Sequence, residues 1–180
     1  ELLDTGILVV VDEAYAEFRG VTVAPWVAEY ENLIVLRTFS KWAGLAGMRV
    51  GYGLFPPDIA SHIMKIKPPY NINIAAQIAV LESLSDLDYL NTKVKAIINE
   101  RERLFSRLKT FSFLKVYPSQ ANFILCQVLS GQARKIYEEL AQVGIFVRFF
   151  DTSLLRNFIR ISVGKPEHTD ALIEALKKTG

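Results

Sequence analysis

The 180-residue sequence predicts an α/β fold, in which part of a mostly parallel sheet is followed by a small α+β domain. Two apolar runs, residues 7–11 and 33–36, are short and β-branched enough to be buried parallel strands. Beyond them come a long amphipathic helix and then alternating strand-like and helix-like patterns. We assign residues 1–86 to the C-terminal part of a large domain, and residues 87–180 to a linking helix and a small C-terminal domain.

The large-domain segment is expected to form neighbouring strands joined by short helices. About 20 residues separate the two apolar runs, which suffices for the right-handed crossover that joins parallel strands. Residues 26–30 have the pattern of a short helix within that crossover. Residues 50–55 alternate glycine with larger side chains and stop at a proline pair, which predicts a strand returning along the sheet. A short helix is predicted over residues 56–67.

Two further helices are predicted in the middle of the chain. Asn73 is placed to cap the first, which Ser85 and Asp86 interrupt. The second is long and amphipathic, and its interleaved basic and acidic residues indicate a solvated face rather than a groove for nucleic acid. The apolar positions at helical spacing are Ile74, Ile78, Leu81 and Leu84 in the first helix, and Leu90, Val94, Ile97, Leu104 and Leu108 in the second.

The last part of the chain has the order strand, helix, strand, strand, helix. Residues 122–126, 145–150 and 158–163 supply the strands, the last two by alternation of apolar and polar side chains. Ser130 is expected to cap the first helix, and Lys-Pro-Glu at residues 165–167 opens the last. The side chains expected to face inward are Ala133, Ile136, Tyr137, Leu140 and Val143 in the first helix, and Ala171, Leu172, Ala175 and Leu176 in the last.

Composition argues against several classes of function. A net charge of +2 and a pI near 8.7 are too balanced for binding to nucleic acid or to acidic membranes. No apolar stretch approaches the roughly 20 residues of a membrane span, so a soluble protein is expected. The single cysteine, Cys126, lies in an apolar strand-like run, which indicates a core residue in a reducing compartment. His62 and His168 lack companions at metal-ligand spacing, so we expect no metal site.

The start of the sequence has an unusual form. The chain opens on Glu1 without an initiator methionine and runs almost at once into an expected buried strand. It has no polar lead-in and no signal peptide pattern. We therefore interpret the chain as a piece of a longer protein.

Lys41 lies just beyond the carboxyl end of the strand predicted over residues 33–36, at the edge where open α/β sheets bind ligands. Anion-binding groups flank it in the sequence, namely the hydroxyls of Thr38 and Ser40 and the guanidinium fork of Arg49. The stretch therefore combines an amine with a cradle for phosphate. The simpler alternative is a solvated loop lysine near a surface arginine.

An amine beside a phosphate cradle matches the needs of pyridoxal phosphate, whose aldehyde condenses with a lysine and whose phosphate requires fixed donors. Asp12 ends the other apolar run and leaves the same sheet edge as Lys41 if the two strands are parallel. A buried carboxylate needs a partner, and Asp12 is placed to keep the cofactor's ring nitrogen protonated. Tyr15 is placed to donate to the ring's phenolate oxygen. The alternative for this pair is an N-cap aspartate and a packed tyrosine.

The Thr-x-Ser-Lys segment, with the arginine that follows it, resembles the lysine motif of fold-type I pyridoxal-phosphate-dependent aminotransferases. The D-x-A-Y segment resembles the same family's ring-binding motif, and TFSKWAGLAGMRVGY and PPYNIN are similar to its histidinol-phosphate aminotransferases. The resemblance implies a fold-type I large domain, a small C-terminal domain, and amino transfer between histidinol phosphate and 2-oxoglutarate or glutamate in histidine biosynthesis. It also implies that Arg160, in FIRISVG, binds the substrate's anionic group together with Arg148, and that the full-length protein is a homodimer acting on small molecules.

The resemblance covers nearly all of this chain but only about the second half of such an enzyme, so these residues are expected to be inactive alone. A related aromatic aminotransferase or a threonine-phosphate decarboxylase would share nearly every motif. A non-catalytic aminotransferase-like binding or regulatory module is the alternative from another class. The expected compartment is the cytoplasm, with the plastid stroma as the alternative.

Overall fold

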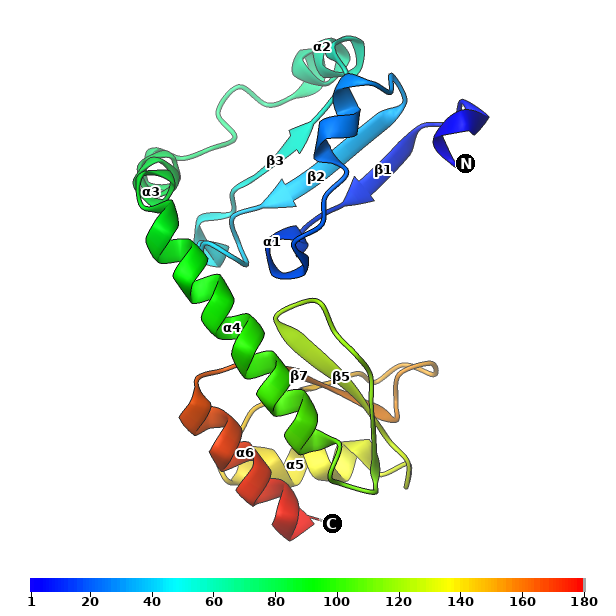
Figure 1. The fold of residues 1–180 in the computed structure, drawn as a ribbon, viewed down its shortest axis with the longest axis vertical. Coiled ribbons are helices and arrows are strands. Elements are labelled where there is room, and N and C mark those ends of the chain that lie inside the picture. Colours follow the sequence, from blue (N-terminus) through cyan, green and yellow to red (C-terminus); the bar gives the residue numbers. More distant parts are fainter. Residues whose placement is uncertain (180) are drawn as a thin grey trace. The chain divides into compact units, whose positions relative to one another are not determined.

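The computed structural model describes residues 1–179, which form two compact units, Glu1–Val94 and a second that begins at Lys95 (Figure 1). The division falls within helix α4 (Leu87–Leu108), which runs from one unit into the other. The assignment of residues 1–86 and 87–180 to separate domains stays a prediction. No helix among residues 1–179 has the length and apolar character that a membrane span requires.

The first unit contains a three-stranded sheet with the order β1-β2-β3. Strand β1 (Val9–Asp12) is parallel to β2 (Leu33–Thr38), and β2 is antiparallel to β3 (Gly51–Leu54). Asp12 therefore stands opposite Leu36. Both the parallel pairing and the returning strand that the sequence predicted are confirmed.

The crossover from β1 to β2 is made of short helices. Helix α1 (Ala16–Arg19) follows β1, and the 3-10 helix η2 (Ala24–Ala28) precedes β2. The short helix predicted over residues 26–30 is present, but it begins two residues earlier, with Pro25 in its first turn. A proline fits there because the amide hydrogen that it lacks would have no partner within the helix. Two further 3-10 turns are η1 (Leu3–Thr5) and η3 (Ala46–Met48).

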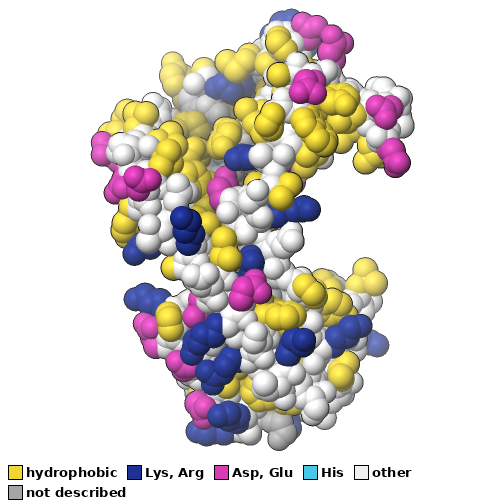
Figure 2. All heavy atoms as spheres, viewed as in Figure 1, with side chains coloured by type: hydrophobic (Ala, Val, Ile, Leu, Met, Phe, Trp, Pro, Cys, Tyr) yellow, Lys and Arg dark blue, Asp and Glu magenta, His cyan; other side chains and the backbone are white. Residues whose placement is uncertain are grey.

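Burial in the sheet follows the position of each strand. The first three residues of β2, the central strand, are buried as expected, whereas Val10 in β1 is 53% exposed. The predicted fully buried strand over residues 7–11 is thus wrong, because the side chains of β1 alternate between half-buried and exposed, so the described residues leave one face of this strand uncovered. Asp12 is exposed as well, so the premise that its carboxylate is buried is also wrong. Figure 2 shows the apolar surface that the first unit presents on one face.

Three helices follow the sheet, namely α2 (Pro57–Ile66), α3 (Ile74–Ser85) and α4. The cap predicted at Asn73 is confirmed, since its Oδ1 accepts a hydrogen bond from the Ala76 amide at 2.8 Å. The four apolar residues of α3 at helical spacing are nevertheless exposed, and Ala76 is its one buried side chain among the described residues. The amphipathic character of α4 is confirmed, because it buries Val94, Leu104 and Leu108.

The second unit is an antiparallel sheet with two further helices, which confirms the predicted α+β pattern. Its strand order is β4-β5-β7-β6, and every pairing is antiparallel. The strands are β4 (Leu114–Val116), β5 (Phe123–Val128), β6 (Arg148–Phe149) and β7 (Phe158–Ser162), and the helices are α5 (Ala133–Gln142) and α6 (Pro166–Thr179).

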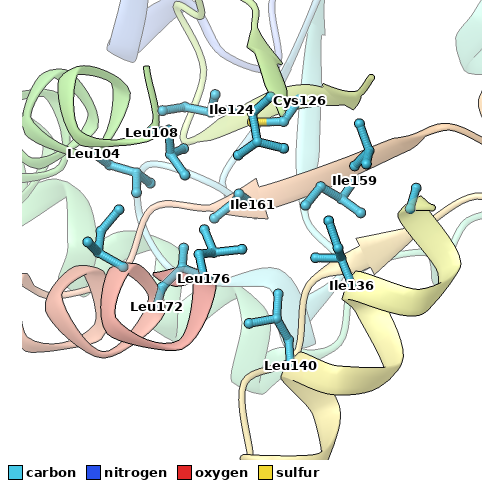
Figure 3. Packing of buried hydrophobic residues seen from close by; sticks show 14 residues of the cluster. Leu104, Leu108, Ile124, Cys126, Ile136, Leu140, Ile159, Ile161, Leu172 and Leu176 are labelled. Carbon is cyan, nitrogen blue, oxygen red and sulfur yellow. The ribbon is translucent and has the colours of Figure 1, made fainter. Parts of the chain in front are cut away.

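The core of the second unit lies where α4, α5 and α6 pack against β5 and β7. Figure 3 shows side chains of these five elements pointing toward one another. Leu104, Leu108, Leu140 and Ile159 are among the most deeply buried. The full set of buried residues is Leu104, Leu108, Leu114, Ile124, Cys126, Val128, Ala133, Ile136, Leu140, Ile159, Ile161, Leu172, Ile173 and Leu176.

Some details of α5 and α6 differ from expectation. Ser130 does not cap α5, because the chain first turns through Gly131 at a φ of 74° and the helix begins after Gln132. Val143 was expected inward but is 64% exposed, since it lies beyond the last helical residue and leaves the buried face. In α6 the exposed Ala171 falls outside the buried stripe, which includes Ile173 instead.

Cys126 is confirmed as a core residue, with no exposed surface. Burial raises the pKa of its thiol to about 12. Because the thiolate is the reactive form, we expect the folded chain at about pH 8 to react with a disulfide-exchange reagent at least about 100-fold more slowly than the urea-unfolded chain. Stopped-flow measurement of thiol release tests this expectation. Equal rates would show that Cys126 is accessible in the fold.

Candidate active site

The arrangement of β1 and β2 brings two of the sequence-predicted residues to one edge of the sheet. Asp12 is the last residue of β1, and Lys41 lies in the loop that follows β2. Since the two strands are parallel neighbours, their carboxyl ends open on the same edge. The shared edge on which the sequence argument depends is confirmed.

Lys41 and Tyr15 are in contact at this edge. The Lys41 Nζ lies 5.7 Å from the centre of the Tyr15 ring, within the range in which an ammonium is attracted to an aromatic face. Tyr15 comes from the turn between β1 and α1, and Lys41 from the loop after β2. An amine and a phenol from separate segments therefore meet beside the end of β1.

The Asp12 carboxylate is oriented by its own turn. Its Oδ1 accepts a hydrogen bond from the Ala14 amide at 2.9 Å. Among the described residues no ion pair engages Asp12, although it is exposed at the same edge as Lys41. One carboxylate oxygen is thus fixed by the backbone, and the other is left to a ligand or to water.

The loop that carries Lys41 is anchored by its neighbours. Phe39 and Trp42 are buried on either side of Lys41, with their ring centres 5.7 Å apart, whereas Lys41 itself is exposed. The Thr38 hydroxyl accepts from the Ser40 amide at 3.0 Å and donates to the Val50 carbonyl at 3.3 Å. Packing of the two aromatic rings therefore holds the amine on the outside of the loop.

Arg49 has an unusual backbone conformation. With a φ of 56°, it is the one non-glycine residue in the described part of the chain that adopts a left-handed conformation. For a residue other than glycine this costs roughly 1–2 kcal/mol. Its guanidinium donates to the Ala46 carbonyl at 3.1 Å and makes no ion pair with the described residues. The turn thus presents an unneutralised cation after the Lys41 loop.

Sequence reasoning missed a buried ionic cluster beneath these residues. The Glu13 carboxylate accepts hydrogen bonds from the Thr22 hydroxyl and the Val23 amide, both at 2.6 Å, and from Arg37 Nε and Nη2 at 3.0 and 2.8 Å. Glu17 lies 3.4 Å from the same guanidinium. The signal was available, because Glu13 also follows an apolar strand and a buried carboxylate needs a partner.

The cluster keeps Glu13 ionised. Burial tends to raise the pKa of its carboxyl, but the hydrogen bonds from Thr22, the Val23 amide and Arg37 outweigh burial and lower the pKa below the usual 4.5. For Glu17 burial dominates and raises the pKa. Because the pKa of Glu13 is lowered on folding, its stabilising contribution is present above pH 4.5 and is lost as the pH falls through the lowered value.

The second unit contains the two predicted arginines. Arg148 on β6 stands directly opposite Arg160 on β7, and their guanidinium carbons lie 5.5 and 6.0 Å from the centre of the Phe150 ring. Arg160 also lies 5.0 Å from the Phe123 ring centre, and its buried Nε lacks a hydrogen-bond partner within the described chain. Facing like charges destabilise a sheet, and no described carboxylate pairs with either one. This pair is suited to an anion.

Residues 1–179 contain no group of three or more histidine, cysteine, aspartate or glutamate side chains that could hold a metal ion. His62 and His168 are both exposed, as expected.

Comparison with known proteins finds relatives that match nearly the whole chain. The family model described as aminotransferase class I and II matches residues 1–176. A histidinol-phosphate aminotransferase of Dehalococcoides mccartyi is 53% identical over 180 residues, which are 100% of this chain and 50% of that protein. The chloroplastic histidinol-phosphate aminotransferase 1 of Arabidopsis thaliana is also 53% identical, over 99% of this chain and 43% of its own length.

A solved structure of another histidinol-phosphate aminotransferase has a similar fold. The crystal structure of histidinol-phosphate aminotransferase from Sinorhizobium meliloti in complex with pyridoxal-5'-phosphate matches with a TM-score of 0.85 at 33% identity. The match covers 96% of this chain and 48% of that chain. The predicted fold class, a mixed α/β architecture of fold-type I aminotransferases, is thereby confirmed. The chain spans about half the length of the curated relatives that it matches, and it belongs to the class I and II aminotransferase family.

Proposed function

We propose that this chain, within a protein of its relatives' length, transfers an amino group between histidinol phosphate and 2-oxoglutarate or glutamate with pyridoxal phosphate as cofactor. The observation that carries the proposal is the contact of the Lys41 amine with Tyr15, at the sheet edge where Asp12 also ends its strand. The 53% identity to histidinol-phosphate aminotransferases supports this substrate.

The residues at this edge fit the cofactor in their chemistry. Lys41 offers an amine for the aldehyde, Asp12 a carboxylate for a protonated ring nitrogen, and Tyr15 a hydroxyl for the ring oxygen. Thr38, Ser40 and Arg49 offer donors for the phosphate. The unneutralised Arg49 and the exposed Asp12 are both groups that a charged ligand would pair. When bound, pyridoxal phosphate supplies an electron sink that stabilises the negative charge left when a substrate carbon loses its proton.

In this proposal Lys41 has two functions. Its amine would hold the cofactor through the aldehyde, and once free the same Nζ would accept and return the proton of the substrate carbon. Asp12 keeps a positive charge on the ring by holding its nitrogen protonated. The Tyr15 hydroxyl donates a hydrogen bond to the ring oxygen, which stabilises negative charge on that atom.

The phosphate group of the cofactor is assigned to three donors. The Ser40 hydroxyl makes no hydrogen bond within the described chain, so it is available to a phosphate oxygen. Thr38 donates to the Val50 carbonyl at a long 3.3 Å, a bond that a charged acceptor would replace. The Arg49 fork provides paired donors of the kind that bind phosphate.

Arg148 and Arg160 are assigned to the anionic group of the substrate. The reaction alternates between an amino alcohol phosphate and a dicarboxylate, so one site must accept phosphate and carboxylate in turn. Two guanidinium forks bind either group through paired hydrogen bonds. The direct cross-strand placement of these arginines, without a carboxylate, supports this assignment.

Assembly and compartment are further parts of the proposal. We propose a homodimer for the full-length protein, acting on small molecules and neither on nucleic acid nor at a membrane. We place it in the cytoplasm, or in the plastid stroma if the source is a plant, since the matched relatives include a bacterial protein and one named chloroplastic.

Substrate profiling of the full-length protein with pyridoxal phosphate tests this function. We expect the kcat/KM for glutamate formation from 2-oxoglutarate to be at least about 100-fold higher with histidinol phosphate than with phenylalanine or tyrosine. The reason is that the two arginines bind a phosphate group, which the aromatic amino acids lack. Equal or better turnover of the aromatic amino acids would instead indicate an aromatic aminotransferase.

Two other outcomes would contradict the proposal. Release of carbon dioxide from threonine phosphate, without glutamate formation, would indicate a decarboxylase. Cofactor binding without turnover of any of these substrates would indicate a non-catalytic module.

A further inference from the structure

Glu13 is a buried carboxylate set between two residues of the proposed site. Its side chain is 7% exposed, whereas Asp12 is an exposed residue. The Glu13 amide extends the β1–β2 pairing by donating to the Leu36 carbonyl at 2.8 Å. Successive side chains of a strand point to opposite faces, so the conformation that directs Glu13 inward directs Asp12 outward.

The Glu13 carboxylate joins segments that are distant in the sequence. Its two oxygens receive the Thr22 hydroxyl and the Val23 amide from the crossover, and two nitrogens of Arg37 from β2. A buried charge with this many charge-assisted and neutral bonds is fixed in one orientation, because losing any of them leaves a polar group unpaired. Glu13 is therefore a rigid point at the end of β1.

Arg37 extends the same connection toward the lysine loop. It directly precedes Thr38, and it stands opposite Tyr52 of β3 in the sheet register. Its Nη2 also donates to the Thr22 hydroxyl at 2.7 Å. The ion pair of Glu13 and Arg37 thus joins the end of β1 to β2, the two strands that lead to Asp12 and to the Lys41 loop.

The backbone of Glu13 forms the base of the turn that carries Tyr15. The Ala16 amide donates to the Glu13 carbonyl at 3.1 Å, which closes the turn around Tyr15. A displacement of Glu13 would consequently move Asp12 on one side and Tyr15 on the other. Neither the family match nor the comparisons give Glu13 or Arg37 a function.

We propose that Glu13, through its ion pair with Arg37, is a positioning residue that holds Asp12 and Tyr15 in the orientation required to bind pyridoxal phosphate. This inference rests on the proposed function. In this proposal Glu13 contacts neither cofactor nor substrate, and it acts by fixing Asp12, which precedes it, and Tyr15, which follows two residues later.

The test is Glu13→Gln in the full-length protein loaded with pyridoxal phosphate. Glutamine keeps the size of the side chain but loses the charge and places an amide donor where Arg37 or the Val23 amide needs an acceptor. We expect the pH midpoint of the visible absorption change of the lysine-bound cofactor to rise by about one unit, because a loosened Tyr15 hydrogen bond no longer stabilises charge on the ring oxygen. The cofactor dissociation constant should rise about tenfold, and kcat should fall about tenfold with KM little changed.

Two matched variants separate positioning from a general effect of charge. Glu17→Gln removes a carboxylate that lies 3.4 Å from the same guanidinium but does not flank Asp12, and it should leave midpoint and affinity unchanged. Arg37→Gln should reproduce Glu13→Gln. Because the two residues act as one unit, the double variant should be no worse than the more severe single variant.

Each outcome has one interpretation. If the unsubstituted protein shows no lysine-bound cofactor, the proposed function fails. If it does, and Glu13→Gln has the same midpoint and affinity, or Glu17→Gln is equally impaired, the positioning function fails. Should circular dichroism show that Glu13→Gln is unfolded, Thr22→Val is the substitute, because it removes one donor to Glu13 and one acceptor of Arg37. It should give a smaller upward shift of the midpoint, and an unchanged midpoint would overturn the proposal.

Discussion

Replacing Lys41 by alanine in the full-length protein is expected to lower the rate of amino transfer by at least about a thousandfold. The amine is proposed both to hold the cofactor and to carry the proton, and proton transfer by a positioned side chain alone contributes about 10²–10⁴-fold. Lys41 is exposed, and the buried Phe39 and Trp42 hold its loop. The substitution should therefore remove the amine while the loop keeps its conformation.

Single-turnover kinetics with histidinol phosphate measures the loss. Borohydride reduction of the cofactor-loaded protein, followed by peptide mapping, should place the label on the peptide that contains Lys41 and Trp42. Lys65→Ala changes an exposed lysine of α2 in the same unit and should alter neither result. A label on another peptide, or a Lys41→Ala rate within about tenfold of the unsubstituted protein, would remove Lys41 from its proposed function.

The second large effect is expected in the core of the second unit. Leu140 in α5 is fully buried in the cluster that α4, α5, α6, β5 and β7 share. Truncating a buried leucine to alanine removes its transfer free energy and leaves a cavity, so Leu140→Ala should lower the free energy of unfolding of this unit by about 2–5 kcal/mol.

Native-state hydrogen exchange of amides in β5 and β7 is the appropriate measurement, since a chain with two compact units need not unfold in a single step. Val143→Ala is the matched control. It also shortens an aliphatic side chain next to α5, but Val143 is 64% exposed, so the change should stay within about 0.5 kcal/mol. Equal effects of the two substitutions would show that Leu140 is not part of the core.

The sequence predicted the order of elements well because apolar periodicity is a local property. It predicted burial less well, because periodicity identifies side chains that favour burial without identifying what covers them. Val10 lies in a continuous apolar run and Ile78 at helical spacing, yet the described residues leave both largely exposed. Val143 was misplaced for a smaller reason, since the helical period was extended past the point where α5 ends.

Some features of the candidate site could likewise be predicted from the sequence, and others could not. Lys41 and Asp12 could be predicted because each follows an apolar strand, and parallel pairing then places them at one edge. That Glu13 needs a partner could also be predicted, but the identity of that partner could not, because Arg37 is far away in the sequence and meets Glu13 only through the strand register. Register also explains why the facing of Arg148 and Arg160 emerges only from the structure.

The edge position of β1 has a practical consequence for work with these residues. No described strand pairs with the outer side of β1, so a row of backbone donors and acceptors is left open beside the exposed Val10. Such an edge is a template on which other chains can stack as added strands. A preparation of the 180 residues alone should therefore be prone to aggregate as its concentration rises, and a lysine in place of Val10 is the substitution best suited to keep it dispersed.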